Sequence, residues 1–178
     1  TYTIDDLSGA TSNTASVTIT IALVNDPPTA ADDNPNVNEG ALGNFNLAAN
    51  DSDPDDGLDL GSIAIVTPPV QGAIVINPNG TVDYTHNGSE TTNDAFTYSI
   101  RDLAGAVSNP GIVSVIVNPI NDSPVAVNDV GNVDQGQLVN INVAANDTDV
   151  DNALNLASIS IIAAPAFGTA VPQANGTV

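Results

Sequence analysis

The sequence contains no cysteine, methionine or tryptophan, and a single residue, Arg101, carries all of its positive side-chain charge. Without cysteine the chain can form neither disulfides nor thiolate metal sites. The formal net charge is −20, so no basic patch exists that could neutralise phosphates, and we predict that nucleic acid is not a partner. Anionic membrane surfaces are excluded in the same way, and no apolar run is long enough to predict membrane insertion.

Aromatic residues are also scarce, at 3% of the chain, whereas hydrophobic residues reach 42%. A core must therefore be built mostly from Val, Ile, Leu and Ala. Val, Ile and Thr recur between closely spaced Gly and Pro, and no segment keeps a helical period. These features predict an all-β fold.

A gapless internal match at an offset of 96 residues divides the chain into tandem repeats. Residues 25–63 align with 121–159, and residues 1–24 align with 97–120. A period of this length indicates modules that are each large enough to be a small domain. We predict the last two strands of a preceding repeat in 1–24, a complete repeat in 25–120, and the first five strands of a following repeat in 121–178.

The complete repeat contains seven short apolar segments separated by Pro, Gly, Asn and Asp. Seven short strands in about 100 residues are typical of an immunoglobulin-like Greek-key β-sandwich. Alternation in the sixth segment places Phe96, Tyr98 and Ile100 on one face. The predicted strands are 28–31, 42–47, 62–67, 72–76, 80–85, 95–101 and 111–118.

Acidic residues gather in the loop that follows the second predicted strand, as "NDSDPDD" at 50–56 and again as "NDTDVDN" at 146–152. In an immunoglobulin-like sandwich this loop, the loop after strand six and the segment leading into strand one lie at the same end. The residues predicted to converge there are Asn25, Asp26, Asp51, Asp53, Asp55 and Asp102.

A second candidate cluster is predicted at the opposite end of the complete repeat, where it meets the next one. Its members are Glu39, Asp122, Asp147 and Asp149, with Glu90 or Asp94 as further candidates. Two carboxylates in contact repel by about 1 kcal/mol in water and about 4 kcal/mol at an effective dielectric of 20. Calcium takes six to eight oxygen ligands and would remove this repulsion, so Ca²⁺ is the predicted cofactor. The alternative is that these Asp and Asn residues only form turns and aid solubility.

Four short motifs together carry a family resemblance. They are "A-x-D-x-D" at 49–53, "D-x-x-G" at 102–105, "E-G" at 39–40 and the linker "N-D-x-P" at 25–28 and 121–124. This combination resembles cadherin-type repeats, most closely the bacterial cadherin-like tandem repeats of large secreted (RTX-type) adhesins. The resemblance implies a calcium-rigidified array on the bacterial surface and adds Asn121 to the linker ligands. Glu39 becomes Gln135 in the third repeat, which departs from the pattern.

Two functions fit these features. The first is a calcium-rigidified structural repeat, or extender, of an extracellular bacterial adhesin that serves cell adhesion and biofilm formation. The alternative is a building block of an extracellular filament, surface layer or matrix, with strands completed between chains. The predicted partners are neighbouring repeats of the same protein and, in the second case, other copies of the chain. A carbohydrate-binding module is a weaker third option.

Catalysis finds little support. Paired carboxylates recur in every repeat, whereas an active site would normally occur once. The only histidine, His86, is expected in a solvated loop, and Arg101 is expected to be a counter-charge to Asp102. An EF-hand starting at Asp51 fails, because its sixth position holds Asp56 instead of glycine. We therefore predict that the protein is not an enzyme.

Overall fold

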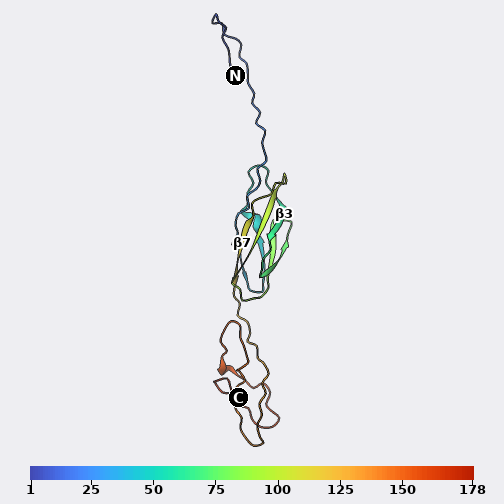
Figure 1. The fold of residues 1–178 in the computed structure, drawn as a ribbon, viewed down its shortest axis with the longest axis vertical. Helices are drawn as coiled ribbons and strands as arrows, with labels where there is room; N and C mark the ends of the chain where they lie inside the picture. The colour runs from blue at the N-terminus through green and yellow to red at the C-terminus, as the bar shows by residue number, and fades with distance from the viewer.

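The computed structural model describes all 178 residues, and its three parts follow one another along an elongated molecule (Figure 1). Residues 25–120 form a β-sandwich in the middle. Residues 1–24 extend from one end of the sandwich, and residues 121–178 lie beyond the other end. None of the helices has the length and hydrophobicity that a membrane crossing requires.

Seven strands build the sandwich from two sheets, with the orders β1-β7-β6-β3 and β2-β5-β4. β1 runs parallel to β7, and the other neighbouring strands are antiparallel. The strands are β1 (Asn36–Asn38), β2 (Leu42–Asn46), β3 (Leu58–Thr67), β4 (Gly72–Ile76), β5 (Thr81–His86), β6 (Asn93–Asp102) and β7 (Gly111–Asn118). Two short 3₁₀ helices also occur, η1 (Leu47–Ala49) and η2 (Leu156–Ser158). The predicted all-β sandwich is confirmed.

The core lies between the two sheets and depends most on β6. Every second residue of this strand is buried, from Asp94 through Phe96, Tyr98 and Ile100 to Asp102. This is the alternation that a strand with one face on the core requires. All 13 buried hydrophobic residues form one cluster within the sandwich, so the predicted inward face of the sixth strand is confirmed.

The first predicted strand, 28–31, is wrong. In that segment Thr29 makes one isolated bridge, and the first strand begins at Asn36 instead. The backbone of Ala30 bonds to a side chain: its N–H donates to Asn109 Oδ1 at 3.1 Å, and its carbonyl accepts from Asn109 Nδ2 at 2.8 Å. The side chain of Asn109 thus makes the backbone hydrogen bonds that a neighbouring strand would make. A pattern of apolar residues does not reveal such a partner.

Residues 1–24, predicted as two strands, contain only isolated bridges. One of them joins Tyr2 to Ala15. At an offset of 96 residues this pair corresponds to Tyr98 and Gly111, which pair between β6 and β7. The segment therefore keeps the register of a β6–β7 hairpin, although its apolar side chains are exposed.

Residues 121–178 likewise contain no continuous strand, although the sequence predicts five there. A bridge between Asn142 and Thr177 repeats, at the same offset, the pairing of Asn46 with Thr81 between β2 and β5. The segment corresponds to residues 25–82, so counterparts of β6 and β7 are not among its residues. Most of its large apolar side chains are exposed.

Gly72 at the start of β4 leaves room for the ring of Tyr84. A Cβ atom added at Gly72 would lie 2.5 Å from two ring carbons of Tyr84, whose hydroxyl donates to Asp94 Oδ2 at 2.8 Å. We expect Gly72→Ala to lower the free energy of unfolding by about 1–3 kcal/mol, because the buried ring must move. Urea unfolding measures this change.

Gly61→Ala in β3 is the matched control. Its added Cβ would meet nothing closer than 3.5 Å, so the free energy of unfolding should stay within about 1 kcal/mol of wild type. Equal losses in the two variants would contradict the steric explanation.

Candidate metal centres

Three segments meet at the end of the sandwich that faces residues 1–24: the linker into the repeat, the β2–β3 loop and the β6–β7 loop. Asn25 Nδ2 donates to Asp102 Oδ2 at 2.8 Å. The N–H of Asp26 donates to Asp55 Oδ2 at 2.6 Å. These contacts join the linker to both loops, which is the convergence that the order of the strands predicts.

Asp53, Asp56 and Asp102 form the centre of this end, and we call them the upper cluster. Each offers a carboxylate oxygen, and these oxygens all lie within 4.8 Å of one another. Asp53 Oδ1 accepts from the N–H groups of Asp55, Asp56 and Gly57 at 2.9, 2.8 and 3.0 Å. Asp53 Oδ2, in contrast, is buried and has no hydrogen-bond partner.

The pKa values of two acids in the upper cluster shift in opposite directions. The N–H of Asp56, followed by those of Gly57 and Asp55, keeps the pKa of Asp53 below its ordinary value, so this carboxylate stays charged. Burial raises the pKa of Asp56, and the negative charges of Asp102 and Asp53 raise it further. The fold therefore brings these charges together although nothing in the cluster neutralises them.

Asp51 lies apart from the upper cluster, in contrast to the prediction. Its Oδ1 accepts from the N–H of Ala31 at 2.8 Å and from the hydroxyl of Tyr98 at 2.9 Å. Burial raises the pKa of Asp51. Asp33 lies close by, and burial together with the charge of Asp51 raises the pKa of Asp33 to about 6. Tyr98 thus holds Asp51 toward the core.

A lower cluster lies at the opposite end of the sandwich and consists of Glu39, Glu90 and Asp122. Their carboxylate oxygens also lie within 4.8 Å of one another. Glu39 follows β1, Glu90 lies in the β5–β6 loop, and Asp122 belongs to the next repeat. Burial raises the pKa of Glu90, and the charges of Glu39, Asp151 and Asp122 add to this shift.

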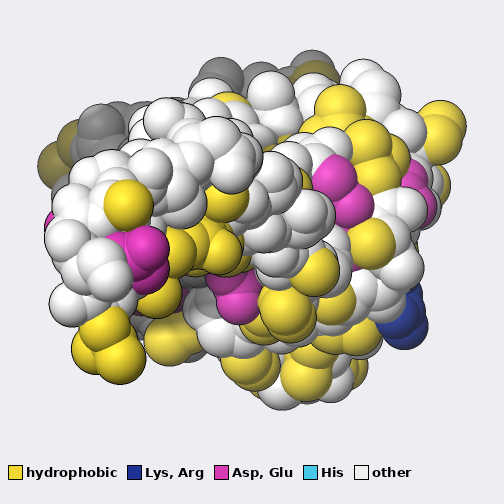
Figure 2. Space-filling model, turned by 90° about the horizontal axis from the view of Figure 1, so that it is seen from above, with side chains coloured by type: hydrophobic (Ala, Val, Ile, Leu, Met, Phe, Trp, Pro, Cys, Tyr) yellow, Lys and Arg dark blue, Asp and Glu magenta, His cyan; other side chains and the backbone are white.

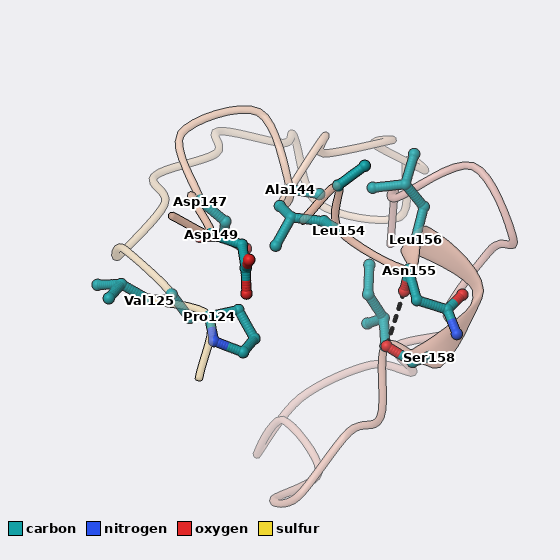
Figure 3. Close-up of a pocket in the computed structure, with 12 residues that line it drawn as sticks. Pro124, Val125, Ala144, Asp147, Asp149, Leu154, Asn155, Leu156 and Ser158 are labelled. Carbon is teal, nitrogen blue, oxygen red and sulfur yellow. Dashed lines mark hydrogen bonds between the residues drawn. The ribbon is translucent and has the colours of Figure 1, made fainter. Parts of the chain in front are cut away.

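The other residues predicted for the second site lie outside the lower cluster. Asp149 Oδ1 accepts from the N–H groups of Asp151 and Asn152 at 3.1 and 2.6 Å, which repeats the loop around Asp53. Asp147 Oδ1 accepts from Val127 N–H at 2.7 Å. Figure 3 shows the side chains of Asp147 and Asp149 together beside Pro124.

Asn121 accepts at Oδ1 from Asn152 Nδ2 at 2.6 Å. The linker and the acidic loop of the third repeat are therefore joined to each other, as Asp26 and Asp55 are in the second.

Sequence reasoning missed Asp56 and gave Glu90 only as an option. The counterpart of Asp56 in the third repeat is Asn152, and both side chains carry an oxygen. Glu90 is one of only two glutamates in the chain. The other option, Asp94, accepts from the N–H groups of Val70 and Gln71 and from the hydroxyl of Tyr84. These bonds occupy both of its oxygens, so Asp94 is a structural residue.

Two further predictions about single residues are wrong. His86 ends β5 with only 3% of its surface exposed, so it does not lie in a solvated loop. Arg101 donates from Nη1 to the carbonyl of Gly105 at 2.9 Å and does not act as a counter-charge to Asp102. Figure 2 shows acidic side chains in several separate places and a single basic side chain. The acidic clusters therefore have no basic partner within this chain.

Comparisons with known proteins agree with this fold. Residues 25–119 match the family model of the bacterial cadherin-like domain. Residues 121–178 match the family model of the bacterial Ig domain. A comparison with curated proteins gives no match. The resemblance to a bacterial cadherin-like repeat is therefore confirmed, and domains of these two kinds are typically structural or adhesion modules.

The raised pKa of Asp33 predicts a pH dependence in calcium-free buffer. The folded state holds the proton up to about pH 6, so the stability it contributes is complete below pH 4 and is lost as the pH rises to 6. Between pH 4 and pH 6, we expect the free energy of unfolding of Asp33→Asn to fall by about 1 kcal/mol less than that of wild type, a value that allows for solvent screening. Urea unfolding at several pH values measures it.

Asp5→Asn is the control, because it removes the same charge from an exposed residue in the N-terminal segment. If wild type and Asp33→Asn show parallel pH profiles, Asp33 does not hold a proton in the folded state.

Proposed function

Because the chain belongs to the bacterial cadherin-like domain family, we propose that it is a structural repeat of an extracellular bacterial adhesin whose junctions are stiffened by Ca²⁺. In this role the repeats form a spacer that carries a distant binding region away from the cell, in adhesion and biofilm formation. The protein is then secreted or held at the cell surface, and its immediate partners are neighbouring repeats.

The observation that carries this proposal is the unpartnered Oδ2 of Asp53. A buried carboxylate oxygen without a hydrogen bond is costly, and natural structures rarely leave one. This oxygen belongs to a group of three carboxylates, a set of hard oxygen donors that suits Ca²⁺. The residues present therefore fit the ion that the family implies.

The repeat relates the two clusters to each other. Asp122 in the lower cluster corresponds to Asp26, which bonds to the acidic loop at the upper end. Its neighbour Asp151 corresponds to Asp55. A complete junction would therefore combine Glu39 and Glu90 of one repeat with the linker and acidic loop of the next. In residues 25–120, the lower end provides the first half of this arrangement and the upper end provides the second.

Residues of the upper cluster that would hold the ion are Asp53, Asp56 and Asp102, with Asn25, Asp26 and Asp55 around them. At the lower end they are Glu39, Glu90 and Asp122, with Asn121 and Asp151 nearby. When bound, Ca²⁺ would supply the positive charge that offsets the repulsion between these carboxylates. The lower carboxylates come from two repeats. Without the ion, their repulsion would therefore push the two repeats apart and favour bending at the linker.

A second candidate function, a filament or surface-layer component, is favoured by a cavity in residues 121–178. The cavity has a volume of about 240 Å³, and its lining includes Leu154. The counterpart of Leu154 is Leu58, which packs against the core cluster that contains Ile100. Ile4 occupies the position of Ile100 in residues 1–24 and is exposed, so one copy could fill the cavity of another.

The calcium proposal predicts that chelation lowers the melting temperature and reduces the maximum dimension measured by solution scattering. We expect Asp53→Asn to lose the part of the calcium-dependent rise in melting temperature that the upper cluster contributes while keeping the loop fold, since asparagine retains an acceptor for the three N–H groups. A ligand at 100 times its dissociation constant adds about 2.7 kcal/mol to stability.

Asp59→Asn serves as control, because Asp59 is an exposed acid outside both clusters. If the two variants lose equal amounts of the calcium effect, the charge acts diffusely and no defined site exists. If wild type does not respond to chelator, the calcium proposal is wrong.

The filament candidate predicts that the protein assembles with increasing concentration and that Ile4→Asp abolishes this assembly, because a further carboxylate cannot enter at low cost a mostly apolar cavity whose lining already holds Asp147 and Asp149. Light scattering measures it. Leu7→Asp is the control, since Leu7 lies at a turn and its counterpart Leu103 is exposed in the sandwich. A monomer at every concentration excludes this function.

A further inference from the structure

The two turns that carry Glu39 and Glu90 touch each other at a pair of glycines. Gly40 has φ +64° and Gly88 has φ +78°, a region of backbone conformation that favours glycine. A Cβ atom added to Gly40 would lie 3.9 Å from the Cα of Gly88. The lower cluster therefore depends on how closely these two turns are held together.

His86 bonds to both turns at once. Its Nδ1 accepts from the N–H of Gly40 and from the N–H of Gly88, each at 3.2 Å. One lone pair thus serves two donors, which is consistent with the length of both bonds. The ring is 3% exposed, so water cannot replace it as the acceptor.

The two bonds at Nδ1 also fix the tautomer of the ring. Since Nδ1 accepts, the proton of the neutral imidazole lies on Nε2, which donates to Thr91 Oγ1 at 3.2 Å. Thr91 Oγ1 lies 3.0 Å from Ser89 Oγ, and Ser89 Oγ donates to Gln71 Oε1 at 3.2 Å. The residues on both sides of Glu90 are therefore held by a chain of hydrogen bonds that begins at His86.

We propose that His86 is the positioning residue of the lower cluster: through Nδ1 it holds the Glu39 and Glu90 turns at the separation that cation binding requires. This inference rests on the proposed function, because the cation is the Ca²⁺ proposed for that cluster. His86 contributes no ligand of its own, since both ring nitrogens are already in use. Partners that orient ligands in this way commonly change metal affinity 10–100-fold when they are replaced.

The two possible amide replacements of His86 make a matched pair. His86→Asn places an acceptor near the position of Nδ1 and can still bond to Gly40 and Gly88. His86→Gln places its polar atoms one bond further out, near Nε2, and has no acceptor atom at the δ position where one is needed. Both variants are polar and close in size. Asn keeps the acceptor for Gly40 and Gly88 and gives up the donor to Thr91, whereas Gln keeps a donor near Nε2 and gives up that acceptor, so the pair tests which bond positions the turns.

The experiment is a calcium titration of the full chain, followed by amide NMR signals near each cluster. Gly40 and Ile120 report on the lower cluster, and Gly57 and Leu103 report on the upper one. We expect His86→Gln to weaken binding at the lower cluster about tenfold and to leave the upper cluster unchanged. His86→Asn should stay within about twofold of wild type at both. Equal weakening at both clusters, or equal effects of the two variants, would overturn the proposal.

Hydrogen exchange in calcium-free buffer tests the positioning independently of the ion. The amides of Gly40 and Gly88 should exchange at least about tenfold faster in His86→Gln than in wild type or His86→Asn, with unchanged exchange in β6. If wild type binds no calcium but this exchange pattern appears, the proposed function fails while the role of His86 in holding the two turns is supported. If exchange at both glycines is the same in all three proteins, His86 does not position them.

Discussion

The alternation of buried side chains along β6 is the constraint on which the rest of this structure depends. Its apolar residues Phe96 and Ile100 join the two sheets, while three polar residues on the same face fix what surrounds them. Asp94 binds the turn before β4, Tyr98 holds Asp51 through its hydroxyl, and Asp102 binds the linker through Asn25. Core packing and the geometry of the acidic loops are therefore set by one strand, since a shift of one residue would turn all of these side chains away from the core.

Much of the fold follows from the sequence, because a period of two in burial and a fixed repeat are both visible in the order of residues. The offset of 96 residues also proves to be structural, since the partial repeats on either side keep the pairing register of the complete one. The first strand could not be predicted in this way. Its expected segment bonds through Ala30 to the side chain of Asn109, a residue distant in sequence, and a local apolar pattern contains no information about such a partner.

The candidate site was predictable at the level of loops but less so at the level of individual carboxylates. Strand order brings Asp53, Asp55 and Asp102 to one end of the sandwich, and it brings Glu39 to the linker that carries Asp122. The direction of each side chain within a loop decides which carboxylates lie close together. Asp51 turns inward to Tyr98 and away from Asp53, although the two are neighbours in the motif. Asp56 was not among the predicted ligands, although its counterpart Asn152 lacks only the charge and keeps a side-chain oxygen.

The chain has one basic side chain for 21 acidic ones, yet most of its carboxylates are not without partners, because backbone N–H groups take the place of cations. Asp94 shows this effect most clearly. Burial alone would raise its pKa, but three backbone N–H groups and the hydroxyl of Tyr84 donate to it and keep its pKa below the ordinary value. Asp53 differs, because three N–H groups bind one of its oxygens while the other has none. A backbone-bound carboxylate is held rigidly and stays ionised, so an oxygen left over on it is both negative and fixed in place. This combination distinguishes Asp53 from acids such as Asp94, and it cannot be read from the number of charges.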